Sequence, residues 1–352
     1  MSRCAIITGV AGQDGSYLTE LLLSKDYYVF GLVRRTSSDT YREKIAHLEN
    51  NANIKLCYGD LTDISSIQNI LGHAIKHPSF TTSNFHLEIY NLAAQSHVKV
   101  SFETPIYTAN SDAIGTLHIL ESIRQLEPAI QKRVKFYQAS TSEMFGSSPA
   151  PQNENTPLHP CSPYGVAKLY AHWITINYCE SYKLWACSGI LFNHESERRC
   201  KNFVTRKITC AVAKYKNNST AYKPLQLGNI ESIRDWGYSP DYVYGMWLIM
   251  QQETPKTYVL ATGKSYTIRE FIELAYKNIG VEVVWKGIAE NEKGYNKENN
   301  DLLIEINPKF YRPTEVNNLQ GDATLASTEL GWQPSITLEE MVKRMVEYDI
   351  LQ

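Results

Sequence analysis

Short apolar runs rich in β-branched and aromatic residues alternate with longer amphipathic stretches through the first half of the chain. The strand-like runs are CAIIT, YYVFGLV, IKLCYGD, HLEIYNLA, RVKFYQAS and CSGILF. Between them, stretches such as SYLTELLLSK and TLHILESIRQL carry apolar residues at helical spacing. This alternation predicts a parallel sheet with helices on both faces. Right-handed crossovers place the carboxyl ends of the strands on one rim, where ligands bind in such sheets.

The pattern becomes less regular after Phe192. A helix is expected from about Phe203 to Tyr215, a strand over 257–263, and a helix that opens at Ser265 or Thr267. The polar segment 289–300, AENEKGYNKENN, is expected to be a mobile loop.

Two interleaved domains follow from these patterns. We predict an α/β fold with a doubly wound, Rossmann-like parallel sheet and a smaller, interleaved α/β substrate-binding domain. The cofactor-binding domain is expected to comprise residues 1–191 with about 229–261. The substrate-binding domain is expected to comprise about 192–228 and 262–352.

Composition excludes several classes of function. The 352 residues include 35 basic and 37 acidic side chains, a net charge of −2, so no overall field attracts nucleic acid or an anionic membrane. The N-terminus lacks the pattern of a signal peptide, and no apolar run reaches the roughly 18 residues of a membrane span. We therefore expect a soluble, cytoplasmic protein. Its seven scattered cysteines include no C-x-x-C pair, which indicates neither a metal site nor a disulfide framework.

The first strand runs directly into TGVAGQDGSYL, which places Gly9, Gly12 and Gly15 before a helix. Glycines permit a tight turn and close approach of the backbone to a pyrophosphate, which the helix N-terminus stabilises. The spacing G-x-x-G-x-x-G is weak evidence alone, since an ordinary strand-to-helix turn also accounts for it. Its position after a first strand favours a dinucleotide site.

The second strand ends in Arg34 and Arg35, where an NAD-binding protein usually has an acidic residue. Two guanidinium groups suit a 2′-phosphate, so the sequence favours NADP. Alternatively, one or both arginines lie on a solvated surface, and Asp39 contacts the ribose. Asp60, at the end of the third strand, is positioned to accept a hydrogen bond from the adenine amino group.

The fifth strand leads into QASTSEMFG (138–146), with Thr141 and Glu143 two residues apart. Side chains two apart on an extended segment point to the same side, so both are expected to face one substrate. Tyr164 and Lys168 follow four apart in SPYGVAK, a spacing that places them on one face of a helix beginning near Pro163. A nearby ammonium and a nicotinamide cation would lower the pKa of the tyrosine and make it a base. A turn rich in Ser and Thr, with a Y-x-x-x-K that occurs by chance, is the alternative.

With these motifs the chain closely resembles the extended short-chain dehydrogenase/reductase superfamily and, within it, the GDP-mannose 4,6-dehydratases. The resemblance covers essentially the whole chain. GILFNHE, VTRKI and RDWG are its most specific motifs, because they separate this family from epimerases and from dehydratases that act on other nucleotide sugars.

The resemblance implies a lyase that converts GDP-mannose to GDP-4-keto-6-deoxymannose with recycled NADP. Tyr164 would take the proton of the C4 hydroxyl while hydride leaves C4, and Thr141 would hydrogen-bond O4. Glu143 would then remove the C5 proton and help to expel the C6 hydroxyl as water, before hydride returns to C6. The catalytic set implied is Thr141, Glu143, Tyr164 and Lys168.

The resemblance also implies two binding sets. The residues expected to hold NADP are Gly9, Gly12, Gln13, Asp14, Arg34, Arg35, Ser37, Asp60, Leu61, Leu92, Ala93, Ser96, Tyr107, Lys168, His194 and Arg199. The residues expected to hold the nucleotide sugar are Ser96, Asn193, Lys207, Arg234, Arg312 and Glu315. No metal is expected. A homodimer or homotetramer is implied, with Arg35 shared across an interface.

One loop departs from the family pattern. Relatives usually read HESPRRG after the sixth strand, whereas this chain reads HESERRC, with Glu197 for proline and Cys200 for glycine. Proline fixes φ and glycine permits φ > 0, so this loop is expected to be more mobile or differently bent, with Cys200 open to oxidation.

Two alternatives remain at this point. Tyr164 and NADPH are competent to reduce the 4-keto group further, to a GDP-6-deoxyhexose such as GDP-rhamnose. A different class of protein, an inactive NADP-sensing binding protein, would be expected to lose one of the four catalytic residues. All four are present.

Overall fold

The computed structural model describes residues 3–36, 43–82, 84–311 and 314–352. Its centre is a seven-stranded sheet in the order β11-β6-β5-β4-β1-β2-β3, in which every neighbouring pair is parallel. The strands are β1 (Arg3–Thr8), β2 (Tyr27–Val33), β3 (Ile54–Tyr58), β4 (Leu87–Asn91), β5 (Val134–Thr141), β6 (Trp185–Leu191) and β11 (Tyr258–Leu260). The predicted doubly wound parallel sheet is confirmed.

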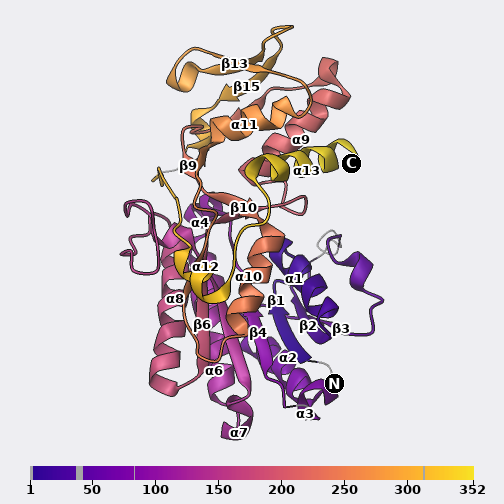
Figure 1. The fold of residues 1–352 in the computed structure, drawn as a ribbon, viewed down its shortest axis with the longest axis vertical. Coiled ribbons are helices and arrows are strands. Elements are labelled where there is room, and N and C mark those ends of the chain that lie inside the picture. Colours follow the sequence, from indigo (N-terminus) through magenta and orange to yellow (C-terminus); the bar gives the residue numbers. More distant parts are fainter. Residues whose placement is uncertain (1–2, 37–42, 83, 312–313) are drawn as a thin grey trace.

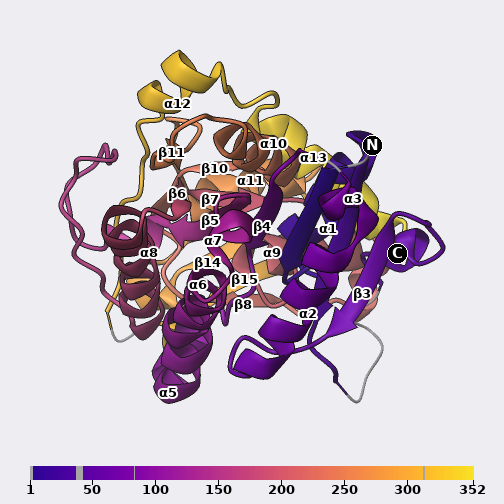
Figure 2. The ribbon, with the colours of Figure 1, turned by 90° about the horizontal axis from the view of Figure 1, so that it is seen from below.

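Helices cover both faces of this sheet (Figure 2), because its strands bury side chains on alternate sides. In β1, Ala5 and Ile7 belong to one core, whereas Cys4 and Ile6 belong to the other. The helices on the first face are α1 (Gln13–Ser24), α10 (Ser239–Met250) and α12 (Thr324–Leu330). The helices on the second face are α2 (Ile64–Lys76), α6 (Gly115–Arg124) and α8 (Pro163–Tyr182).

The remaining segments of the first lobe are short. They are η2 (Ala46–Leu48), α3 (Pro78–Thr81), α4 (Val98–Glu103), α5 (Pro105–Thr108), the π-helical turn η3 (Ala109–Ile114), α7 (Pro128–Gln131) and the 3₁₀ turn η4 (Ser142–Met144). Within the described part of the chain, none of the helices combines the length and the apolarity that a membrane span needs.

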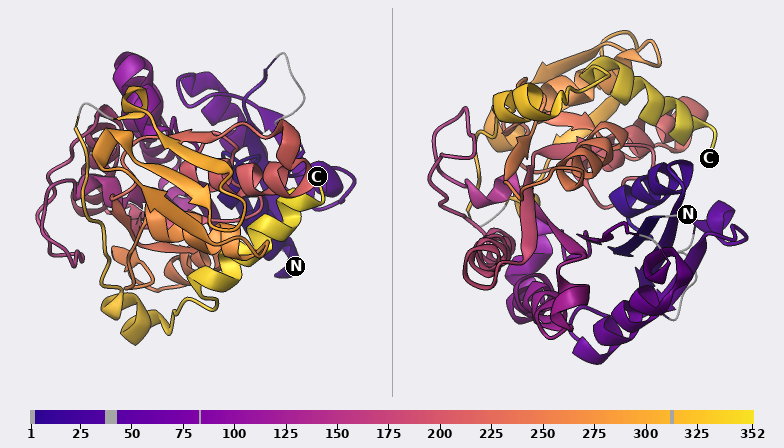
Figure 3. Two further views of the ribbon diagram at one scale, coloured as in Figure 1. Left: turned by 90° about the horizontal axis from the view of Figure 1, so that it is seen from above. Right: turned by 60° about the horizontal axis from the view of Figure 1, so that its bottom comes forward.

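A second lobe lies beyond the carboxyl rim of the sheet, at the top of Figure 1. Its helices are α9 (Val204–Asn217), α11 (Ile268–Lys277) and α13 (Leu338–Ile350). They share a core with a four-stranded sheet, β13-β14-β15-β8, seen in orange over the first lobe in the left panel of Figure 3. Its strands are β8 (Leu225–Leu227), β13 (Val283–Lys286), β14 (Lys293–Asn296) and β15 (Leu302–Ile306). Three short turns complete this lobe: η5 (Ser219–Ala221), η6 (Ala289–Asn291) and η7 (Pro308–Phe310).

The segment 289–300 is not the loop expected from its polarity. It contains β14, which pairs with both β13 and β15 in the middle of the small sheet. Its side chains alternate between half-buried and buried positions, and the buried Asn296 donates a hydrogen bond to the Tyr215 hydroxyl at 3.0 Å. Pairing on both sides and one satisfied amide therefore make a strand from residues whose composition favours a loop.

The chain crosses between the lobes several times. Two short pairings lie at the junction: β7 (Asn193–Glu195) with β10 (Trp236–Tyr238), and β9 (Ile233–Arg234) with β12 (Tyr266–Thr267). α12 and Trp332 return to the core of the first lobe before α13 enters the second. The lobes are thus interleaved, and the domain boundaries expected from the sequence stay a prediction.

Candidate active site

A cavity of about 660 Å³, the central cavity, has walls from both lobes and from the carboxyl rim of the parallel sheet. The predicted site residues that line it are Gly9, Gly12, Gln13, Asp14, Arg34, Asp60, Leu61, Leu92, Ala93, Ser96, Tyr107, Thr141, Glu143, Tyr164, Lys168, Asn193, His194, Arg199, Lys207, Arg234 and Glu315. Arg35 does not line it. Ser37, Asp39 and Arg312 lie outside the described residues.

The glycine-rich loop joins β1 to α1 and needs glycine at two positions. Gly9 has φ = +70°, and a Cβ there would lie 2.9 Å from the Ala93 backbone. A Cβ on Gly15 would lie 2.2 Å from the Gly9 carbonyl oxygen. The loop therefore packs against the end of β4 while the first turn of α1 meets the cavity, the arrangement that binds a pyrophosphate at a helix N-terminus.

The first turn of α1 is tied to β7, the segment where the chain leaves the first lobe. Asp14 Oδ2 accepts a hydrogen bond from His194 Nε2 at 2.9 Å, and its Oδ1 accepts one from the Ser239 hydroxyl at 2.8 Å. His194 Nδ1 lies 2.7 Å from the Phe192 carbonyl oxygen, so both ring nitrogens face acceptors. Both ring nitrogens can donate at once only in the imidazolium form, which the neighbouring Asp14 carboxylate favours.

The pKa values of this pair agree with that assignment. Burial acts to raise the pKa of Asp14, but the charge and hydrogen bond of His194, with hydrogen bonds from Gln13 and Ser239, bring it below its usual range. Burial acts to lower the pKa of His194, yet the Asp14 carboxylate raises it overall. Both ring nitrogens of His194 are engaged within the protein. His194 therefore holds the first turn of α1, next to the glycine-rich loop, in place.

Arg34 and Arg35 lie in different places. Arg34 follows β2, lines the cavity and donates a hydrogen bond to the Tyr107 hydroxyl. The Arg35 guanidinium lies 5.6 Å from the centre of the exposed Tyr58 ring. Of these two arginines, only Arg34 therefore lines the cavity.

The ends of β3 and β4 form the wall between these groups. Asp60 Oδ1 accepts hydrogen bonds from the backbone and the hydroxyl of Thr62, at 2.9 and 2.8 Å, which closes the turn after β3. Thr8 Oγ1 accepts hydrogen bonds from the backbone amides of Leu92 and Ala93, both at 3.1 Å. The chain beyond β4 is thereby pinned to β1, beside the glycine loop.

Thr141 and Glu143 both line the cavity, but not as neighbours on one strand. β5 ends at Thr141, whose hydroxyl caps the 3₁₀ turn η4 by accepting a hydrogen bond from the Glu143 amide at 3.2 Å. The expectation of a continuous extended segment was wrong, because the threonine cap begins a turn at this point. The buried Glu143 is held in that turn.

Tyr164 and Lys168 lie on α8, which begins at Pro163 as predicted. The Ser162 hydroxyl caps this helix, and Pro163 occupies its first turn. A Cβ on Gly165 would lie 2.9 Å from the Glu143 carbonyl oxygen, so glycine allows α8 to pack closely against η4. Lys168 Nζ donates a hydrogen bond to the Ala139 carbonyl oxygen at 3.0 Å. Tyr164, Lys168, Thr141 and Glu143 are thereby brought together.

The protein's own groups raise the pKa of Tyr164. Burial is the largest cause, and the Asp112 and Glu143 carboxylates add to it, whereas a hydrogen bond from Thr141 and the charge of Arg199 act in the opposite direction. Burial lowers the pKa of Lys168, which Asp112 partly offsets. The expected lowering of the tyrosine pKa therefore needs a further positive charge beside the phenol.

Asp112, which the sequence analysis did not single out, lies in the π-helical turn η3. It is fully buried, and its Oδ1 accepts hydrogen bonds from the Gln95 amide at 2.8 Å and from the Ser111 hydroxyl. Burial raises its pKa, and Lys168 acts to lower it. No local pattern identifies this residue, because only the packing of η3 against α8 brings it near the catalytic pair.

The part of the cavity that lies towards the second lobe is the substrate end. It includes four of the residues expected to hold the nucleotide sugar: Asn193, Lys207, Arg234 and Glu315. Asn193 is the first residue of β7, and its buried Oδ1 has no hydrogen-bond partner among the described residues. Arg199 Nε pairs with Glu195 at 3.0 Å, and its guanidinium stacks 3.6 Å from the Phe203 ring centre. Arg234 Nη1 donates to the Ile233 and Val316 carbonyl oxygens, both at 2.8 Å.

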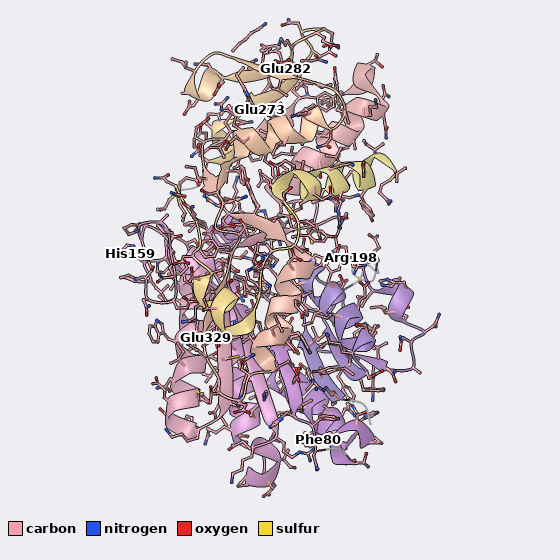
Figure 4. The ribbon with its side chains drawn as sticks, in the orientation of Figure 1. Phe80, His159, Arg198, Glu273, Glu282 and Glu329 are labelled. Carbon is pink, nitrogen blue, oxygen red and sulfur yellow. The ribbon has the colours of Figure 1, made fainter. Side chains whose placement is uncertain are left out.

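The HESERRC loop is tied to α1. The Glu197 carboxylate accepts hydrogen bonds from the hydroxyls of Tyr17 at 3.0 Å and Tyr238 at 3.3 Å. Arg198, labelled in Figure 4 near the junction of the lobes, donates to Ser16 and Glu20. Cys200 is exposed, lines the cavity and is not among the described residues with positive φ. The loop thus accommodates both departures without the backbone geometry that glycine would allow, and its mobility stays a prediction.

This arrangement supports acid–base chemistry on a bound alcohol. A phenol, a threonine hydroxyl and a carboxylate face one cavity, next to a glycine loop and a helix N-terminus. A base of this kind must come within hydrogen-bond reach of the proton that it abstracts. The presence of Glu143 in addition to Tyr164 gives the cavity a second base.

Comparison with known proteins identifies close relatives of this chain. A family model described as GDP-mannose 4,6 dehydratase matches residues 6–345. A GDP-mannose 4,6 dehydratase of Drosophila melanogaster is 50% identical over an alignment of 356 positions, which covers 99% of this chain and 86% of that protein. The enzymes of the same name from Vibrio cholerae and Homo sapiens are each 47% identical, over 99% and 98% of this chain and 94% and 91% of their own length.

Solved structures with much lower identity share the fold. Thermus thermophilus UDP-glucose 4-epimerase in complex with NAD has a TM-score of 0.77 at 22% identity, over 98% of both chains. A Bacillus anthracis dTDP-glucose 4,6-dehydratase in complex with NAD has a TM-score of 0.77 at 20% identity, over 99% of this chain and 96% of that one. RMD from Pseudomonas aeruginosa, complexed with NADPH, has a TM-score of 0.73 at 18% identity over the full length of both chains.

Proposed function

The chain belongs to the GDP-mannose 4,6-dehydratase family, and from that premise we propose how its residues perform the reaction. GDP-mannose binds in the central cavity and is oxidised there at C4. It then loses water across C5 and C6 and is reduced at C6, which gives GDP-4-keto-6-deoxymannose. The observation that supports these roles most directly is that Glu143 and Tyr164 line the same cavity, joined through the contact of η4 with α8.

Tyr164 is the base for the first step. As a phenolate it accepts the proton of the C4 hydroxyl, while Thr141 donates a hydrogen bond to O4 and polarises the ketone that forms. Lys168 lies one helical turn beyond the tyrosine on α8, and its amino group is anchored to the Ala139 carbonyl oxygen. The chemistry that a bound nicotinamide dinucleotide supplies is acceptance of hydride from C4, its return to C6, and a positive charge that lowers the pKa of the phenol.

Glu143 is the base for the elimination. The ketone at C4 makes the C5 hydrogen acidic, and the Glu143 carboxylate removes it. The resulting carboxylic acid then protonates the C6 hydroxyl, which leaves as water. Once hydride has returned to C6, C5 is reprotonated and the C4 ketone remains. A simple alcohol dehydrogenase needs no carboxylate in addition to its tyrosine base. Glu143 therefore distinguishes elimination from oxidation alone.

The residues at the glycine loop fit a dinucleotide. Gly9 and Gly15 allow a tight turn in which a Cβ would collide with backbone atoms at 2.9 and 2.2 Å, and this turn brings the N-terminus of α1 to the cavity. We propose NADP rather than NAD, because Arg34 lines the cavity at the end of β2. The roles expected for Arg35, Ser37 and Arg312, and the cytoplasmic location, stay predictions.

An assay of water loss tests this proposal. The purified protein is incubated with GDP-mannose and catalytic NADP, and mass spectrometry follows the loss of one water from the nucleotide sugar. The wild type is expected to lose water and Glu143→Gln is not. Glu305→Gln, which removes a half-buried carboxylate of β15 outside the cavity, is the matched control. If wild type and Glu143→Gln lost water equally, the role of this carboxylate would be wrong.

Further reduction of the 4-keto group is tested in the same experiment. Stoichiometric NADPH is added once the product has accumulated, and a gain of two hydrogens by the product would establish the reductase activity. Consumption of NADPH must match that gain. Without either change, the protein is a dehydratase only.

We also propose that the protein forms a homodimer through α8 and the neighbouring segments α5 and η3. Val166, Tyr170 and Trp173 are 55%, 40% and 55% exposed and recur at helical spacing along α8, and Ile106 of α5 is 76% exposed. An apolar stripe of this kind on a polar surface marks an interface. A second copy of the chain, related by a twofold axis, would cover it with the same stripe.

Light scattering after size exclusion tests the dimer. Trp173→Glu is expected to shift the protein towards the monomer, since it places a charge in the apolar stripe. Trp285→Glu, on the outer strand β13 of the second lobe, changes the same side chain outside the stripe. If Trp173→Glu left the dimer intact, the interface would lie elsewhere on the protein. The contacts that the resemblance implies for Arg35 would then be the next surface to test.

A further inference from the structure

Two lysines from opposite lobes meet at the substrate end of the central cavity. Lys99 lies on α4 of the first lobe, and Lys207 lies on α9 of the second. Their ammonium groups lie 5.1 and 5.6 Å from the centre of the same ring, that of Phe310 in η7. All three side chains line the cavity. The ring thus holds two positive charges near one another at the place where the lobes face each other.

The ammonium groups of Lys99 and Lys207 repel each other when no ligand is bound. No carboxylate forms an ion pair with Lys99 or Lys207 within the parts of the chain that the structure describes. Burial lowers the pKa of Lys207, and the charge of Lys99 lowers it further. An anion bound between the lysines would relieve the repulsion.

Lys99 also joins the lobes directly. Its Nζ donates a hydrogen bond to the carbonyl oxygen of Lys309 at 3.0 Å, across the cavity from α4. Gly228 lies behind η7, where a Cβ would approach the Phe310 carbonyl oxygen to 2.8 Å. The Phe310 backbone therefore packs closely on Gly228 of the second lobe, while its ring faces a lysine of the first, so the contacts of Lys99 depend on how the lobes are set.

We propose that Lys99 is a substrate-binding residue which, with Lys207, forms a two-lobe anion site for the diphosphate of a nucleoside diphosphate sugar. This inference rests on the proposed function and adds to it a residue from the cofactor lobe. Lys207 supplies one charge from α9, whereas Lys99 supplies the second only when α4 and η7 lie together.

Calorimetric titration with GDP and with guanosine tests the site. Lys99→Gln is expected to weaken GDP binding about tenfold to a hundredfold, the effect of one charge-assisted hydrogen bond, and to leave guanosine binding unchanged. Lys99→Arg keeps the charge and is expected to retain most of the affinity. Lys132→Gln, a surface lysine after α7 outside the cavity, is the matched control. Equal loss of GDP and guanosine affinity would mean a structural role and overturn the inference.

Steady-state kinetics with GDP-mannose separates the two proposals. Because Lys99 contacts the diphosphate and not the reacting carbons, Lys99→Gln is expected to raise KM by the same factor with little change in kcat. If the wild type removes water and Lys99→Gln has an unchanged KM, the anion site is wrong and the proposed function stands. If the wild type removes no water, the proposed function fails, and GDP titration of Lys99→Gln still decides the anion site.

Discussion

The two ends of the central cavity are lined by different parts of the fold. At the cofactor end, the walls come from segments that follow the strands of the parallel sheet: the loop at Gly9, the first turn of α1 and the ends of β3 and β4. At the substrate end, the walls are side chains such as Lys99, Lys207 and Phe310, which come from distant segments of both lobes. The first end is fixed by a single sheet, whereas the second exists only when the lobes pack together. Changes at the two ends should therefore have different consequences.

The largest expected effect is on the chemistry that lies between the two ends. Tyr164→Phe removes the base for the first step, so kcat should fall about 10²-fold to 10⁴-fold while binding of both ligands persists. Turnover and titration with NADP and GDP measure the two properties. Tyr244→Phe, an exposed tyrosine of α10, is the control. Loss of NADP binding in Tyr164→Phe would show that the phenol supports the cofactor end instead.

The next effect concerns the stability of the second lobe. Arg206 of α9 pairs with Asp349 of α13 at 2.5 Å, and both side chains are 3% exposed. Asp349→Asn leaves a buried guanidinium without its partner, so the free energy of unfolding should fall by about 3–5 kcal/mol. Urea unfolding measures it, with the exposed Glu347→Gln as control.

Replacement of both partners gives the complementary test of this ion pair. Arg206→Met with Asp349→Leu should recover most of the lost stability, since two apolar side chains leave no buried charge. If the double variant were as unstable as Asp349→Asn, loss of packing rather than the buried charge would explain the effect.

A smaller effect is expected from one arginine at the cofactor end. Arg34→Gln removes the guanidinium that faces the cavity and should weaken NADP binding about tenfold to a hundredfold, with NAD binding little changed. Arg35→Gln, outside the cavity, should change neither affinity in the monomer. Fluorescence titration with both dinucleotides measures this. Equal losses for the two dinucleotides would argue against contact with a 2′-phosphate.

The smallest effect is the pH dependence that His194 gives to stability. Its pKa is raised in the folded protein, so its stabilising contribution is complete below the unfolded value of 6.5 and is lost as the pH rises through the folded pKa. In that window the free energy of unfolding should fall by at most about 1.4 kcal/mol per pH unit. Unfolding at several pH values above 6.5 measures the slope, which His194→Gln should lack. An identical slope in the variant would mean that other groups titrate there.

The carboxylate partner of His194 contributes in the opposite pH range. The pKa of Asp14 is lowered, so its contribution is present above its unfolded value of 3.8 and is lost as the pH falls towards the folded pKa. Between these two limits the ion pair is complete, and the cofactor loop should be most firmly held to β7.

Much of the cofactor end could be predicted from the sequence, because its signals are local. Strand periodicity gave the parallel sheet, and Gly9 and Gly15 occur where the structure needs residues without a Cβ. Pro163 marks the start of α8, and the spacing of Tyr164 and Lys168 places both at the cavity. These features depend on interactions between residues that are close in sequence and on one repeated strand-helix unit. They can therefore be predicted from the order of the residues.

Other features depended on partners that are remote in sequence. β14 forms from a polar segment because strands lie on both sides of it, and Asp112 approaches Lys168 only through the packing of η3 on α8. Glu143 lies in a turn that Thr141 caps, where the residue spacing indicated a continuing strand.

The sequence by itself determined the parallel sheet, the glycine loop and the residue types proposed for catalysis, since each is encoded within one strand-helix unit. The tertiary structure alone decided which charges share the substrate end. Lys99 and Phe310 are separated by more than half of the chain and face each other across the cavity only after the lobes have packed. Electrostatic interactions act through space and not along the backbone, so residue order alone does not specify such a site.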